Sequence, residues 1–159
     1  MPRSYEIKSL LPEDAAKAYP LIQTAMPRVT LEDWLAYTVW LSQPAATHQK
    51  PAGVMALENS LGYIHGLFSY STGYGLGSGP VLNVDNFIAL DTGDRAAAVT
   101  KLIDAIEDLA HDNGCATIHT HLPESWTKRS SGRTNLHTRL INAGHGPHAV
   151  KLSKTIDPG

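Results

Sequence analysis

Residues 81–122 decide the fold of this chain, and they read VLNVDNFIAL DTGDRAAAVT KLIDAIEDLA HDNGCATIHT HL. The apolar, β-prone run over 81–90 predicts a strand. Apolar residues then recur with the period of an α-helix over 99–110, and an Asn-Gly pair indicates where that helix ends. The run over 115–122 predicts a second strand. We expect this strand–helix–strand unit to be a right-handed crossover between parallel strands.

The rest of the chain supplies strands and helices on both sides of this unit. Pro20 lies inside the first expected helix and should kink or split it. Thr30, with an aspartate three residues later, predicts the start of the second helix. Residues 71–80, STGYGLGSGP, predict a loop because they hold four glycines. The expected strands are 5–10, 51–57, 61–70, 81–90, 115–122 and 150–156, and the other expected helices begin near Pro12 and Gly132. This order predicts an α/β fold, a mixed central sheet of about six to seven strands flanked by about four helices.

Composition excludes several classes of protein. The chain has 159 residues, of which 42% are hydrophobic and 18% charged, so it can bury a core and is not expected to be disordered. A formal net charge of −2 gives no basic field, so we expect neither a nucleic-acid nor a membrane partner. The single cysteine, Cys115, excludes a disulfide scaffold. The opening residues form no apolar signal segment, and we expect a cytoplasmic protein.

The junction between the strand and the long helix resembles a known family. The strand ends in Ile88-Ala89-Leu90-Asp91, and the helix begins with Arg95-Ala96-Ala97-Ala98-Val99-Thr100. In position and lengths this junction resembles the coenzyme A loop of the GNAT acetyltransferase superfamily, which has the form Arg/Gln-x-x-Gly-x-Gly/Ala. Ala98 and Thr100 stand where the family has glycine and glycine or alanine. The chain therefore resembles a divergent member with a degenerate loop, and the order of its elements fits the same family along nearly its whole length.

The resemblance implies acetyl-CoA as the co-substrate. The phosphates would lie at the start of the helix, where unpaired amides and a partial positive charge bind anions. The implied cofactor-binding residues are Ile88, Ala89 and Leu90 on the strand and Arg95, Ala96, Ala97, Ala98, Val99 and Thr100 on the helix. The pantetheine arm would enter between the strands at 81–90 and 115–122, and a backbone amide of the first strand would polarise the thioester. We expect Ala98→Glu to weaken binding with the fold intact, although these alanines also suit an ordinary helix start packed on a sheet.

Transfer of an acetyl group to an amine requires a base that takes the proton of the amine. Asp85 is one candidate, and strand alternation would place it on one face with Phe87 and Ala89, whereas a bulge would change that face. His65, inside an apolar run, and His121, at the end of the last expected strand before residue 123, are the other candidates. Each has an ordinary structural alternative: an aspartate at the strand edge, a core histidine, or an exposed strand histidine.

His119 shares a strand face with His121, so the two side chains are also compatible with a metal pair. No further residue has zinc-ligand spacing, and we assign no metal site. Trp34, Tyr37 and Trp40 recur at helical spacing, which suits core packing or the wall of an acceptor pocket.

The sequence thus predicts one domain over residues 1–159 that acts as an acyl-CoA-dependent N-acetyltransferase on a small-molecule or protein amine. Transfer would be direct, because Cys115 follows a helix end and is expected in the core rather than as a nucleophile. Leu140 stands where the family has the tyrosine that protonates the coenzyme A thiolate. The alternative is therefore a catalytically impaired domain that binds acyl-CoA or another ligand without turnover. The oligomeric state stays open, with a homodimer as one option.

Overall fold

A five-stranded mixed sheet lies at the centre of the computed structural model, which describes residues 4–43, 51–89, 95–122, 134–147 and 152–157. The strands are β1 (Tyr5–Leu10), β2 (Ala52–Asn59), β3 (Ile64–Gly75), β4 (Gly79–Ala89) and β5 (Thr117–Thr120). They lie side by side in chain order. The first four are antiparallel to their neighbours, whereas β5 is parallel to β4. The parallel pair expected from residues 81–122 is confirmed.

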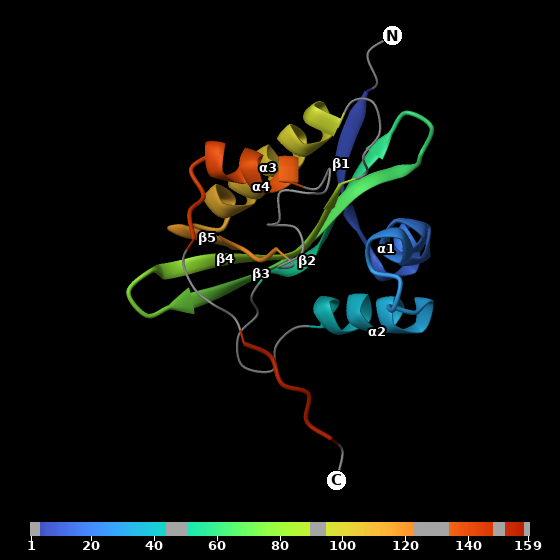
Figure 1. Ribbon diagram of the computed structural model, residues 1–159, viewed down its shortest axis with the longest axis horizontal. Helices are drawn as coiled ribbons and strands as arrows, with labels where there is room; N and C mark the ends of the chain where they lie inside the picture. The colour runs from blue at the N-terminus through green and yellow to red at the C-terminus, as the bar shows by residue number, and fades with distance from the viewer. Residues whose placement is uncertain (1–3, 44–50, 90–94, 123–133, 148–151, 158–159) are drawn as a thin grey trace.

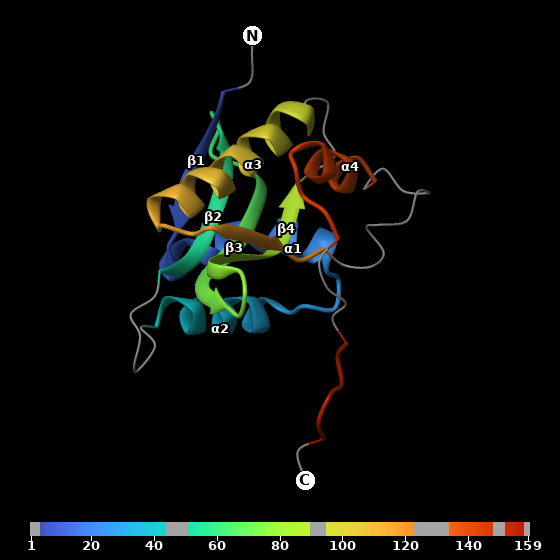
Figure 2. The ribbon, with the colours of Figure 1, turned by 90° about the vertical axis from the view of Figure 1, so that its left-hand side faces the viewer.

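Helices cover both faces of the sheet. A 3₁₀ helix η1 (Pro12–Ala18), α1 (Tyr19–Ala25) and α2 (Leu31–Ser42) cover one face, and α3 (Arg95–Asp112) and α4 (Thr134–Asn142) cover the other, as Figures 1 and 2 show. Pro20 is at the start of α1, where its missing N–H removes no helical hydrogen bond, so the predicted split is confirmed. Thr30 and Asp33 form a reciprocal capping box at the start of α2.

Two expectations about strands are wrong. The described residues form five strands rather than six or seven, and residues 152–156, the described part of the last expected strand, are exposed and have no regular structure. The glycine-rich residues 71–80 are mostly strand: β3 continues to Gly75, and β4 begins at Gly79. Hairpin pairing satisfies most of their backbone groups, and a left-handed backbone that favours glycine occurs only at the turn and its exit, where Gly77 and Gly79 have φ values of 85° and 74°.

The core lies between the sheet and the helices. Phe68 of β3 and Phe87 of β4 are fully buried and stack with ring centroids 6.3 Å apart. Leu102 and Ile106 of α3 are also fully buried, so α3 presents the apolar stripe that the sequence predicts to the interior. Among the described residues no helix is long and apolar enough to cross a membrane.

Gly66 sets how closely α3 approaches the sheet. A methyl group at this position would lie 2.8 Å from Cδ1 of Leu102 and 2.9 Å from the carbonyl oxygen of Ile88. The second neighbour is backbone, so it cannot rotate away.

We expect Gly66→Ala to lower the free energy of unfolding by about 1–3 kcal/mol, because the added methyl overpacks the β3–α3 contact. Gly146→Ala is the matched control, since a methyl there meets no atom within 4 Å. It should change stability by less than about 0.5 kcal/mol. Urea unfolding of both variants measures the difference, and equal stabilities would contradict the packing described.

Candidate functional site

The pairing between β4 and β5 is short. Cα partners run only from Val81 opposite Thr117 to Val84 opposite Thr120, and one further bond joins the N–H of His121 to the carbonyl of Val84 at 2.9 Å. β4 nevertheless continues beside β3 as far as Ala89. Because successive peptide groups of a strand point to opposite sides, some N–H and C=O groups of β4 beyond Val84 face away from β3. In the described part of the chain, no strand pairs with them.

A β-bulge lies directly beyond this point. Ser69 of β3 is opposite Asp85, whereas Leu67 is opposite Ile88, so β4 has one residue more than β3 between the two pairs. Asn86 lies in the bulge with a φ of 55°, a left-handed conformation that residues other than glycine rarely adopt.

The bulge interrupts the alternation that would place Asp85, Phe87 and Ala89 on one face. Phe87 packs in the core on Phe68, whereas the carboxylate of Asp85 is partly exposed and contacts His121. The expected grouping is therefore wrong. An extra residue in the strand shifts the period by one, and sequence alternation cannot show such an insertion.

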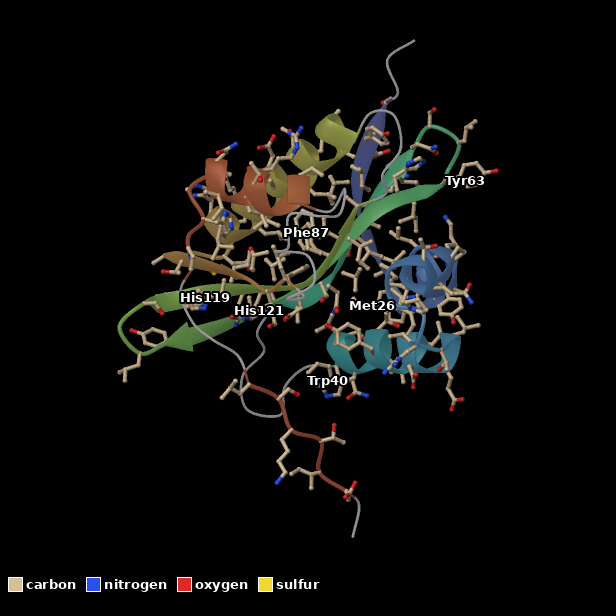
Figure 3. The ribbon with its side chains drawn as sticks, in the orientation of Figure 1. Met26, Trp40, Tyr63, Phe87, His119 and His121 are labelled. Atoms are coloured by element: carbon tan, nitrogen blue, oxygen red, sulfur yellow. The ribbon has the colours of Figure 1, made fainter. Side chains whose placement is uncertain are left out.

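Asp85 and His121, two of the three candidate bases, lie together. Nδ1 of His121 is 2.8 Å from Oδ1 of Asp85, and the two side chains are 45% and 40% exposed. When Nδ1 carries the proton and donates to Asp85, Nε2 keeps its lone pair and can accept a proton. Both residues lie where β5 separates from β4, and Figure 3 shows His121 beside the sheet at this position.

His65 is not part of this arrangement. It is near the start of β3, where its Nε2 is 2.9 Å from Nδ2 of Asn59 and its ring meets the edge of Tyr5. Among the described residues no three His, Cys, Asp or Glu side chains are grouped to hold a metal ion. His119 lies on β5, whereas His121 follows directly after the end of this strand.

Three polar side chains meet beneath the bulge, of which only Tyr37 was named from the sequence, as a possible wall of an acceptor pocket. The hydroxyl of Tyr37 on α2 donates to Oγ of Ser69 at 2.9 Å, and Ser69 donates to the carbonyl of Asp85 at 3.0 Å. Nδ2 of Asn86 is 3.0 Å from Ser69 Oγ and 3.2 Å from the Tyr37 hydroxyl. The one available signal in the sequence is a serine within the apolar run Leu67-Phe68-Ser69-Tyr70.

A cavity of about 980 Å³ opens along β5 on the side of α3 and α4. Its lining includes His121, Thr120, Leu140 and Cys115. Burial raises the pKa of the Cys115 thiol, so the side chain stays protonated and is a poor nucleophile at neutral pH. His121 therefore lines this cavity and also contacts Asp85.

The helix start that the resemblance assigns to coenzyme A is partly described. α3 begins at Arg95, so the helical residues whose amides lack an intrahelical partner are 95–97. Ala98 is 3% exposed and Val99 is fully buried, whereas Ala97 is half-buried and Thr100 is exposed. A glutamate at position 98 would enter the core, which contradicts the expectation that Ala98→Glu leaves the fold intact.

The strand residues assigned to the co-substrate also differ in burial. Ile88 is buried and Ala89 half-buried, at the end of β4 beyond its last pairing with β5. Leu90 lies outside the described residues, and the side chains of Arg95 and Ala96 do as well.

Comparison with known proteins finds matches to the fold of this chain but none to its sequence. No protein-family model matches the chain, and no curated protein matches it by sequence. Solved structures match it along its length. The aminoglycoside N-acetyltransferase AAC(6')-Iy, in complex with the bisubstrate analog CoA-S-monomethyl-acetylneamine, has a TM-score of 0.72 and 14% identity, covering 97% of this chain and 99% of that one.

Two further structures give the same result. An acetyltransferase of Trypanosoma brucei has a TM-score of 0.70 and 14% identity over 96% of this chain and 100% of that chain. A ribosomal-protein-alanine N-acetyltransferase from Brucella melitensis biovar Abortus 2308 has a TM-score of 0.66 and 18% identity over 98% and 100%. The resemblance seen in the sequence is confirmed for the architecture, and this chain has the fold of the GNAT acetyltransferases.

Proposed function

We propose that this protein is an acyl-CoA-dependent N-acetyltransferase that transfers an acetyl group directly to an amine. The observation that carries the proposal is the Asp85–His121 pair at the point where β5 separates from β4. The fold supports it, because the matched structures include N-acetyltransferases, one of them in complex with a coenzyme A bisubstrate analog. Residues 1–159 would form one such domain.

His121 acts as the general base in this proposal. Asp85 accepts the Nδ1–H of His121 and so keeps the lone pair on Nε2, which removes a proton from the ammonium or amine of the acceptor, directly or through one water. The exposed carboxylate of Asp85 also favours the approach of a cationic acceptor. The matched structures include an aminoglycoside N-acetyltransferase and a ribosomal-protein-alanine N-acetyltransferase. An amine of a small molecule or of a protein would suit this chemistry.

The acyl group would lie at the unpaired edge of β4. The amine nitrogen attacks the thioester carbonyl, a C–N bond forms, and the C–S bond breaks as the coenzyme A thiolate leaves. A free N–H of β4 beyond Val84 would stabilise the oxyanion. The proton taken up by His121 can pass to the thiolate, because His121 lines the cavity beside Leu140, where the family has its tyrosine acid.

Coenzyme A phosphates would bind at the start of α3, where several amides lack helical partners. The pantetheine arm would enter between β4 and β5 where the two strands separate, and the cavity beside β5, α3 and α4 adjoins this point at His121.

The second candidate is a domain that binds acyl-CoA without turnover. Leu140 favours it, because a buried leucine cannot supply the proton that the family's tyrosine gives to the thiolate. Titration calorimetry with acetyl-CoA, combined with a thiol-release assay over a panel of amines, distinguishes the two. Binding with turnover supports the transferase, binding without turnover supports the second candidate, and no binding excludes both.

We expect His121→Asn to lower kcat by about 100-fold or more, because the asparagine amide can replace Nδ1 as a donor to Asp85 but offers no basic Nε2. Affinity for acetyl-CoA should stay within about twofold. His65→Asn gives the opposite expectation, since His65 is bonded to Asn59 near the start of β3, and its kcat should stay close to that of the wild type. Thiol release measures both, and a larger loss in His65→Asn would move the base to that residue.

We expect Ala97→Glu to weaken acetyl-CoA binding by at least about tenfold. The glutamate adds negative charge to the first turn of α3, which repels phosphate but favours the helix by about 0.3–1 kcal/mol. Ala97→Gln is the matched control for bulk and should bind within about threefold of the wild type. Calorimetry and thermal unfolding check both effects. Weak binding by both variants would show that size rather than charge matters, and wild-type binding by Ala97→Glu would place the phosphates elsewhere.

A further inference from the structure

The side chains of Tyr37, Ser69 and Asn86 form a closed hydrogen-bonded group, the Ser69 cluster, which joins α2, β3 and β4. Ser69 Oγ donates its one proton to the carbonyl of Asp85. It accepts from the Tyr37 hydroxyl and from Nδ2 of Asn86. A hydroxyl has one donor and two acceptor positions, so the bonding capacity of Ser69 is filled.

The side-chain donor groups of Asn86 also all have partners. Nδ2 of Asn86 has two N–H groups and two partners, Ser69 Oγ and the Tyr37 hydroxyl. Ser69 is 1% exposed, so water does not compete for these bonds. Burial raises the pKa of Tyr37, which keeps its hydroxyl a donor to Ser69 at neutral pH.

The Ser69 cluster holds the side chain of Asn86, the strained residue of the bulge. Asn86 holds a left-handed φ that glycine would adopt more easily, and its side chain is bound on both N–H groups. The preceding residue, Asp85, is held at its carbonyl by Ser69 and at its carboxylate by His121. The backbone of Asp85 is therefore fixed from the α2 side of the sheet, while its side chain reaches the end of β5.

We propose that Ser69 is a positioning residue: with Tyr37 and Asn86 it fixes the bulge of β4 so that the carboxylate of Asp85 meets Nδ1 of His121. The catalytic consequence rests on the proposed transferase function, whereas the geometric claim does not. Without the Ser69 hydroxyl, the Asp85 carbonyl loses this side-chain donor, and the bulge is held less firmly. The carboxylate then no longer selects the Nδ1–H form of His121.

The test compares Ser69→Ala, Tyr37→Phe and Asn86→Gly with Tyr19→Phe. The glycine variant keeps the left-handed backbone accessible and removes only the side-chain bonds. Tyr19→Phe is the matched control, because the Tyr19 hydroxyl donates to the carbonyl of Val29 at 3.0 Å and not to Tyr37, Ser69 or Asn86. Two-bond ¹H–¹⁵N spectra of the histidine rings report the tautomer of His121 in each protein, and thiol release gives kcat and KM.

We expect the wild type and Tyr19→Phe to hold His121 mainly in the Nδ1–H form. Ser69→Ala, Tyr37→Phe and Asn86→Gly should shift the ring toward the Nε2–H form. Their kcat should fall by about tenfold, with acetyl-CoA affinity within about twofold, because misplacement of the base affects the transfer step more than binding.

The proposal would be overturned if the three cluster variants kept the wild-type tautomer ratio of His121. It would also be overturned if Tyr19→Phe shifted this ratio equally, because that result would indicate a general loss of rigidity in the protein. If Ser69→Ala does not fold, Tyr37→Phe decides, since it removes a donor to Ser69 from a half-buried side chain and leaves the buried Ser69 in place. A wild-type protein without acetyl transfer would refute the proposed function, and the ring spectra would still test the positioning role.

Discussion

β5 accompanies β4 for only four residues, and the rest of the site depends on this short pairing. A longer ladder would cover the edge of β4 and leave no backbone group free for a substrate. The pairing ends because β4 gains an extra residue at Asn86 just beyond Val84, which turns the strand while β3 keeps contact with it. Opening one side of a strand while the other side stays paired yields exposed peptide groups on a rigid support. Such a support holds a reacting group more accurately than a loop does.

The contact between Asp85 and His121 is too weak to fix the positions of the two residues by itself. The two side chains are 45% and 40% exposed, and ion pairs this exposed to water contribute little free energy to stability. A weak pair keeps a fixed geometry only when its backbones are already in place. For His121 this support is the bond from its own N–H to Val84, and for Asp85 it is the bond from Ser69 to its carbonyl. The buried cluster thus has the rigidity that the exposed pair lacks, and α2 enters the site through Tyr37.

The sequence predicted the parts of this site that depend on local pattern. The strand–helix–strand unit, the capping box at Thr30 and the division of the first helix at Pro20 follow from periodicity and backbone chemistry. Asp85 and His121 were each candidates, but their contact joins residues 36 positions apart, and no local pattern carries that information. The bulge was hidden for the same reason, because an inserted residue is defined by the partner strand.

Two other expectations failed for different physical reasons. The glycine-rich stretch before Val81 was expected to be a loop from composition, yet strand pairing outweighs the low strand propensity of glycine when both sides of the hairpin are hydrogen-bonded. Ala98 was expected to face a ligand, yet the long helix needs an apolar residue there to pack on the sheet, so it is 3% exposed. In both cases tertiary packing decides the outcome over local preference.

The burial of Ala98 changes the meaning of the missing glycines. α3 is helical from Arg95 onward, and among the described residues Asn86 is the one non-glycine residue with positive φ, so alanines at the helix start carry no such strain. A methyl group at position 98 points into the core and does not obstruct an anion that binds the free amides of the first turn. The loss of glycine is therefore compatible with phosphate binding. The departure that bears on chemistry is Leu140, which has no proton to give. In the proposed transferase, His121, which lines the same cavity, would give the thiolate its proton.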